Sequence, residues 1–70
     1  MTPRIDAWLT EAHWRRAISG KLAPSAPVWT LRLLDGARCV AWGAGASLDE
    51  ATVDLESDLI ATLAKESEGT

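Results

Sequence analysis

The 70-residue sequence predicts one small α+β domain in the order α-β-β-α, in which an amphipathic acidic helix covers a two-stranded antiparallel hairpin. Three observations support this fold class. Asp35-Gly36 separates two apolar alternations, and this dipeptide is typical of a hairpin turn because glycine readily adopts a positive φ. Thr2-Pro3 has the form of a helix N-cap followed by proline at the first helical position. Ser47 and Glu50 form an S-x-x-E capping box, which predicts the start of a second helix.

The hairpin is expected over about residues 28–42, and its register follows from the turn. A turn at Asp35-Gly36 places Leu31 opposite Val40 and Trp29 opposite Trp42. A slip of one residue would divide the apolar side chains between the two faces, so the buried face is expected to fix the register. The predicted core face consists of Trp29, Leu31, Leu33, Val40 and Trp42, and the other face of Thr30, Arg32, Cys39 and Ala41.

The first helix is predicted over about residues 3–19, followed by a linker at 21–27. Gly20 is a natural residue to follow a helix, and Arg15 and Arg16 would lie in the last turn, where the helix dipole favours cations. Arg15, Arg16 and His13 are interpreted as a solvated surface. At about 100° per residue, the apolar stripe facing the core consists of Ile5, Trp8, Leu9 and Ala12. The linker, KLAPSAP, holds two prolines that disfavour a helix.

The second helix is predicted over about residues 48–65, with the last residues fraying. Its core stripe consists of Leu48, Ala51, Leu55, Leu59 and Leu63. Apolar residues also lie outside the core stripes of both helices, which predicts a second interface. The candidate interface residues are Trp14 and Ile18 on the first helix and Val53 and Ile60 on the second. A small chain with no disulfide and with unpaired hairpin edges is expected to bury such residues in a homo-oligomer, most simply a dimer. The alternative for Trp14 is a partly exposed ring packed on the following loop.

The glycine-rich segment from Gly43 to Ser47 leads into a helix N-terminus, an arrangement that attracts anions in many proteins. The dinucleotide-binding fingerprint would require a third glycine at position 48, where this chain has leucine. Asp49 and Glu50 would also repel a phosphate. A small-ligand or anion-binding protein that uses this loop is therefore the alternative to a protein-interaction module.

No catalytic, metal or cofactor site is predicted. The sequence has one cysteine and one histidine, so a disulfide within the chain is impossible and a Cys/His metal site lacks ligands. His13 has no catalytic partner at a meaningful spacing, and Cys39 is expected to be a buried or half-buried inert thiol. The sequence therefore predicts a protein that is not an enzyme.

The net charge of −3 is unevenly distributed. Residues 1–42 hold six basic and three acidic side chains, whereas residues 47–70 hold one lysine and seven acidic side chains. This balance argues against nucleic acid as a partner. No signal-peptide pattern and no apolar run near 18 residues is found, so the sequence predicts a cytoplasmic protein with no membrane partner.

Residues 29–63 resemble the HicB-like small antitoxin family, whose pattern is a strand, a P-D-L-P-G turn, C-V-x-x-G and a helix beginning T-x-E-E-A. Asp35 falls on the aspartate of the turn, Cys39-Val40 on the C-V pair, Gly43 on the glycine, and residues 47–51 on the helix start. The chain lacks both turn prolines, has Arg38 before Cys39, and is predicted to open with a helix where the family opens with a strand. The resemblance implies a sheet-and-helix module that dimerises and recognises a small basic toxin, with no catalytic residue.

Overall fold

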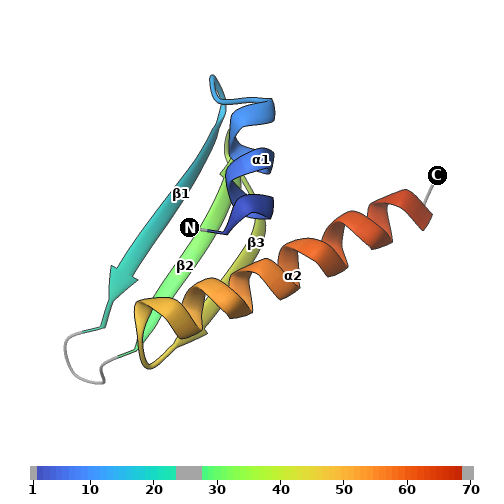
Figure 1. Ribbon diagram of the computed structural model, residues 1–70. Coiled ribbons are helices and arrows are strands. Elements are labelled where there is room, and N and C mark those ends of the chain that lie inside the picture. The colour runs from blue at the N-terminus through green and yellow to red at the C-terminus, as the bar shows by residue number, and fades with distance from the viewer. Residues whose placement is uncertain (1, 24–27, 69–70) are drawn as a thin grey trace.

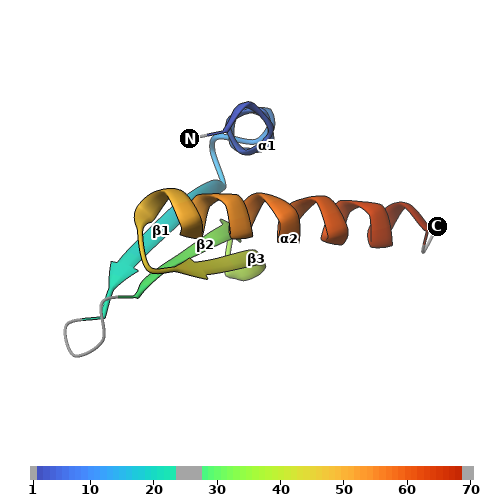
Figure 2. The ribbon, with the colours of Figure 1, turned by 60° about the horizontal axis from the view of Figure 1, so that its bottom comes forward.

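The computed structural model describes residues 2–23 and 28–68 and shows an α+β fold, as predicted. The elements are α1 (Pro3–Glu11), β1 (Arg16–Leu22), β2 (Trp29–Asp35), β3 (Arg38–Gly45) and α2 (Leu48–Glu68). The strands form one antiparallel sheet in the order β1-β2-β3. Both helices lie on the same face of this sheet, which leaves the other face without a covering helix (Figure 1, Figure 2).

The predicted two-stranded sheet is wrong, because residues 16–22 form a third strand instead of the end of the first helix. The helix expected over 3–19 ends at Glu11, and Ala12 has a non-helical φ of −142°. In β1, Ile18 pairs with Leu33 and Gly20 with Leu31, so β1 satisfies the second edge of β2. A hairpin alone is marginally stable in water, and a third strand removes this weakness. Lys21 and Leu22, predicted as linker, belong to β1, and residues 24–27 of that linker lie outside the described residues.

Arg16, the first residue of β1, connects α1 with the sheet through contacts to both. Its guanidinium lies 4.3 Å from the Trp8 ring centroid and donates a hydrogen bond of 2.9 Å to the Trp8 carbonyl. The same side chain pairs with Asp35 across the sheet, with Nε and Oδ2 3.3 Å apart, and is only 14% exposed. Arg15 also binds Asp35, at 2.7 Å. The interpretation as a solvated surface is therefore wrong for Arg16, whereas the Arg15 side chain is 57% exposed.

The register between β2 and β3 differs from the predicted one because β3 contains a bulge. Leu34 pairs with Cys39 but Leu33 pairs with Ala41, so Val40 is an extra residue without a partner in β2. Beyond the bulge, Trp29 lies opposite Gly45 instead of Trp42. The predicted core face is correct for β2. In β3, Val40 packs against the core as predicted, but Ala41 is 2% exposed and Trp42 is 57% exposed, so the assignments of these two residues are wrong.

Small residues face the helix from β3 because α2 lies very close to this strand. A Cβ atom added to Gly43 would collide with the backbone of Leu55, and one added to Gly45 would lie 2.6 Å from the Ala51 nitrogen. A tryptophan on this face would hold the helix away from the sheet. The requirement for close packing therefore explains the bulge that turns Trp42 outward.

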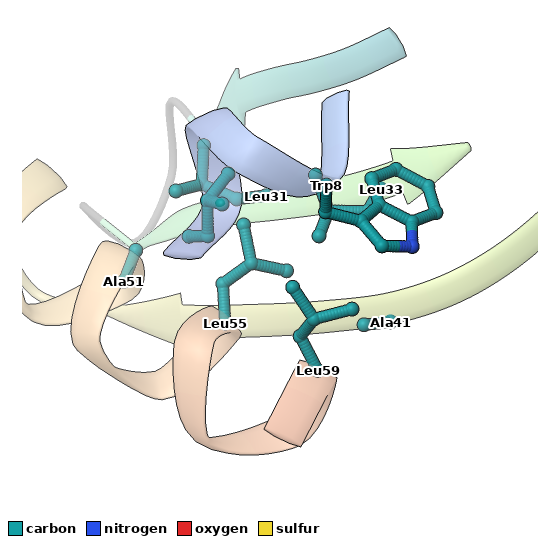
Figure 3. Packing of buried hydrophobic residues seen from close by; sticks show 8 residues of the cluster. Trp8, Leu31, Leu33, Ala41, Ala51, Leu55 and Leu59 are labelled. Atoms are coloured by element: carbon teal, nitrogen blue, oxygen red, sulfur yellow. The ribbon is translucent and has the colours of Figure 1, made fainter. Parts of the chain in front are cut away.

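The core is built between α2, α1 and the helix-covered face of the sheet (Figure 3). Its buried residues are Ile5, Trp8, Leu31, Leu33, Ala41, Ala51, Leu55 and Leu59. The predicted stripes of both helices are confirmed, except that Leu48 is 47% exposed. The cap of α2 is also confirmed, since the Glu50 N–H donates a hydrogen bond of 3.2 Å to Ser47 Oγ. The helix continues to Glu68, beyond the predicted end at residue 65.

Candidate functional site

Three carboxylates of α2 bind the outer edge of β3. The backbone N–H groups of Trp42, Ala44 and Ala46 donate hydrogen bonds to Asp58, Asp54 and Glu50, at 3.0, 2.9 and 3.0 Å. The acceptors are spaced four residues apart and so form one row along the helix. We call Glu50, Asp54 and Asp58 the carboxylate ladder. It satisfies donors that an edge strand would otherwise present to solvent.

The ladder also determines what the loop between Gly43 and Ser47 can bind. The N–H groups of Ala44, Ala46 and Glu50 already have acceptors within the protein. The carboxylates beside them repel anions, and Gly43 and Gly45 are explained by the close approach of α2. The geometry of this loop therefore favours packing over anion binding.

The outer surface of α2 carries exposed apolar side chains between rows of acidic residues. Val53 is 66% exposed and Ile60 is 42% exposed. At 100° per residue, Ser57 and Ala64 complete this stripe. Asp49 and Glu56 lie on one side of the stripe, and the ladder residues Glu50 and Asp54 lie on the other.

Two shallow depressions lie along this stripe, and one of them reaches β3. One, of about 380 Å³, is lined by Asp49, Glu50, Val53, Asp54 and Ser57. The other, of about 390 Å³, is lined by Trp42, Asp54, Ser57, Asp58 and Ala61. Asp54 and Ser57 line both, so the depressions adjoin. We call Trp42, Asp49, Val53, Asp54, Ser57, Asp58 and Ile60 the α2 surface.

The structure separates the four residues predicted as an interface. Val53 and Ile60 lie together on the α2 surface. Trp14 is 73% exposed in the turn between α1 and β1, where its ring meets His13 edge to face at 5.4 Å. Ile18 is half-buried in β1 and packs against the core, so its predicted position on the outer side of a helix is wrong. The role of these residues in an interface stays a prediction.

Sequence reasoning missed Trp42 and the carboxylate ladder. The spacing of Glu50, Asp54 and Asp58 is visible in the sequence, but an acidic row on a helix usually indicates a solvated surface. Its role depends on β3 lying beside that row. Trp42 was assigned to the core because the bulge at Val40 has no clear sequence signal.

The face of the sheet that carries no helix is basic. Lys21 and Arg32 project from this face, and together with Ser19, Ala23 and Thr30 they line a depression of about 410 Å³. Cys39 lies at its far side with Thr30, Arg32 and Trp42. Cys39 is exposed, so the expected buried or half-buried thiol is wrong. Within the described residues, no group of three His, Cys, Asp or Glu side chains is placed to hold a metal ion.

No family model, curated protein or solved structure matches this chain. Among the described residues, no helix has the length and apolar character needed to cross a membrane. The class defined by the geometry is a two-layer α+β domain with an acidic outer helix and a basic open sheet face.

Proposed function

We propose that this chain is a cytoplasmic, non-enzymatic protein-interaction module that forms a homodimer and binds a small basic protein through the α2 surface. The observation that carries the proposal is the exposure of Val53 and Trp42 beside Asp49, Asp54 and Asp58. Exposed apolar groups supply area to bury, and the surrounding carboxylates select a basic partner.

The depression beside Trp42 suits an arginine or lysine side chain. A cation there would lie against the indole ring and within reach of two carboxylates. Asp54 and Asp58 are already oriented by the N–H groups of Ala44 and Trp42, yet each carboxylate retains further acceptor positions. Because these two carboxylates are already held in place, they lose less conformational entropy when a partner's cation binds between them.

The resemblance to HicB-like antitoxins supports the same function. The strand that this family places before its hairpin has a counterpart in β1, so β1-β2-β3-α2 follows the family's order of elements. Gly43, which falls on the family's glycine, is a position where a Cβ would collide with the backbone of α2. We accordingly propose that the partner is a small basic, toxin-like protein.

The test is a titration of the full chain with a synthetic helical peptide of leucine and arginine, followed by NMR. The Trp42 indole and the Val53 and Ile60 methyl signals are expected to shift. A peptide with glutamate in place of arginine is expected to shift none of them. Val53→Lys should raise the Kd at least tenfold, because it places a cation between the acidic rows. Lys21→Glu, on β1 at the opposite margin of the sheet from Trp42, is the matched control and should leave the Kd unchanged.

Two outcomes would contradict the proposal. The first is binding of the leucine–arginine peptide with shifts confined to residues outside the α2 surface. The second favours the alternative function: a titration with inorganic phosphate that shifts Gly43, Gly45 and Ser47. Co-purification with a small basic protein encoded by an adjacent open reading frame would identify the natural partner.

A further inference from the structure

The hydrogen bonds that flank β1 reveal which of its backbone groups face outward. The Ala23 N–H donates to the Val28 carbonyl at 3.1 Å, and the Gly36 N–H donates to the Arg15 carbonyl at 2.9 Å. Both bonds continue the β1–β2 register. Because bonded and non-bonded pairs alternate in an antiparallel ladder, the odd-numbered residues of β1 bond to β2. The even-numbered residues therefore point their N–H and C=O groups away from the sheet.

Three residues of β1 present open backbone groups, namely Ile18, Gly20 and Leu22. The fourth even-numbered residue, Arg16, donates its N–H to the Ala12 carbonyl at 2.9 Å. No described side chain caps the outward groups of the other three. The opposite edge of the sheet differs, since the carboxylate ladder accepts from Trp42, Ala44 and Ala46. The sheet thus has one closed edge, at β3, and one open edge, at β1.

The side chains around β1 leave this edge accessible. The helix α2 lies over β3 and β2, α1 contacts β1 from the helix-covered side, and the outer side of β1 runs free along the margin of the sheet (Figure 1). Lysine often protects an edge strand, but Lys21 is an odd-numbered residue whose side chain lies on the basic sheet face. Leu22 is 46% exposed next to the open backbone groups.

We infer that a second copy of this chain pairs with β1 in an antiparallel manner, around a two-fold axis at Gly20. This inference specifies the surface of the homodimer in the proposed function. The outward N–H and C=O groups of one copy must bond to those of the other copy. Even-numbered residues of β1 therefore pair with even-numbered residues of the second β1. An axis at Gly20 places Ile18 opposite Leu22 of the second copy, and symmetry repeats this pair on the other side of the axis. All three residues with open backbone groups then take part in the pairing.

Charge and shape favour this register over its neighbours. An axis at Ser19 would place Leu22 opposite Arg16, whose guanidinium is already bound to Asp35 and Trp8. With the axis at Gly20, Lys21 lies opposite Ser19 of the second copy, so the lysines do not face each other directly. Gly20 has no side chain, and the space above it is filled by Leu31, whose Cδ2 lies 3.1 Å from where a Cβ would stand. The two strands therefore meet at a position with no side chain of its own.

The resulting dimer has one continuous six-stranded sheet and leaves both α2 surfaces free at its two ends. Because β3 is closed by the ladder, the assembly stops at two copies. Dimerisation through β1 and binding of a basic partner through α2 therefore use separate surfaces and can be tested separately.

Two measurements on the full chain test the inference. Sedimentation equilibrium at micromolar concentrations is expected to show twice the chain mass of 7.5 kDa. Amide hydrogen exchange should show the N–H groups of Ile18, Gly20 and Leu22 at least a hundredfold slower than expected for an open edge. Leu22→Pro removes one outward N–H and no bond to β2, and should shift the species to 7.5 kDa. Trp42→Lys, at an exposed apolar residue away from β1, is the matched control and should remain dimeric.

Three outcomes would overturn the inference. The first is a parent chain at 7.5 kDa throughout, which leaves the peptide titration of the α2 surface unaffected. The second is rapid exchange at Ile18, Gly20 and Leu22 within a dimer. The third is a dimer that survives Leu22→Pro and dissociates with Trp42→Lys, which would place the interface around Trp42 instead of along β1. Exchange in the parent chain decides the matter if Leu22→Pro fails to fold.

Discussion

Gly43 sets the distance between α2 and β3. Substituting alanine would place a Cβ against the backbone of Leu55 and 2.7 Å from the Ala51 carbonyl oxygen, and backbone cannot move aside as a side chain can. We expect Gly43→Ala to lower the free energy of unfolding by about 1–3 kcal/mol or more. Gly20→Ala is the comparison, because within its own chain the Cβ would meet only the flexible end of Leu31. Since Gly20 lies on the proposed two-fold axis, both variants are compared at concentrations where the protein is monomeric. Urea denaturation at equal protein concentrations measures both, and equal costs would mean that α2 does not lie this close.

Arg15 and Arg16 are neighbours with the same charge and the same acidic partner, yet they differ in burial. Arg16 is 14% exposed and also binds the Trp8 carbonyl, whereas Arg15 is 57% exposed. We expect Arg16→Ala to cost about 2 kcal/mol, since a buried charged hydrogen-bond network is lost. Arg15→Ala should cost less than about 1 kcal/mol, as exposed ion pairs do. Thermal melts that rank the two variants in the opposite order would contradict the position of β1.

At the scale of the elements, α2 was predictable and β1 was not. A capping box, a leucine stripe and the absence of proline all favour the same helix from residue 48, so local and tertiary preferences agree. In β1, the arginines before Gly20 resemble a helix end, while Ile18, Gly20 and Leu22 alternate as a strand does. The unpaired edge of β2 decides between these local patterns, because pairing there satisfies backbone groups that a longer helix would leave open.

The bulge at Val40 predicts which residues of β3 tolerate substitution. Ala41 is buried against α2, so Ala41→Leu should overfill the core and cost about 1–3 kcal/mol. Trp42→Ala should be mild, because 57% of this residue is exposed. The register predicted from the turn alone requires the reverse ranking. Chemical denaturation of the two variants therefore distinguishes the registers directly.

The carboxylate ladder predicts how the β3 edge responds to mutation. Asp54→Ala removes the acceptor of the Ala44 N–H, so exchange of this amide should accelerate at least tenfold. Asp54→Asn retains a carbonyl acceptor and should largely preserve the protection. Asp54→Ala combined with Asp58→Ala opens two donors of the edge, and species larger than the dimer should then appear in sedimentation experiments. A double variant with unchanged mass and exchange would show that the ladder is not what closes this edge.

At the scale of the whole molecule, the sequence separates charge along the chain and the fold converts this into two opposite faces. The acidic residues of α2 lie on the helix side, and Lys21 and Arg32 lie on the open sheet face. The candidate site was therefore predictable in part. Helical periodicity was sufficient to find Val53 and Ile60, whereas Trp42 required the bulge and the packing of α2 on β3.

These opposite faces lead to a prediction about salt. Binding of the leucine–arginine peptide to the α2 surface depends on charge attraction, whose range falls from about 10 Å at 0.1 M salt to about 3 Å at 1 M. We expect its Kd to rise at least tenfold between 50 mM and 500 mM NaCl. Dimerisation through β1 depends on backbone hydrogen bonds and on the contact between Ile18 and Leu22. It also brings together the Lys21 and Arg32 side chains of both copies, so salt should leave the dimer unchanged or tighten it.

Sedimentation equilibrium and peptide titration at the two salt concentrations measure these effects in the same samples. If both associations weakened together, self-association would depend on the acidic α2 surface of one copy meeting the basic sheet face of the next. Such a head-to-tail contact does not close on itself, so the mass would keep rising with protein concentration at low salt. A mass that levels off at two copies at both salt concentrations supports pairing at β1, because the ladder on α2 leaves no second edge to extend.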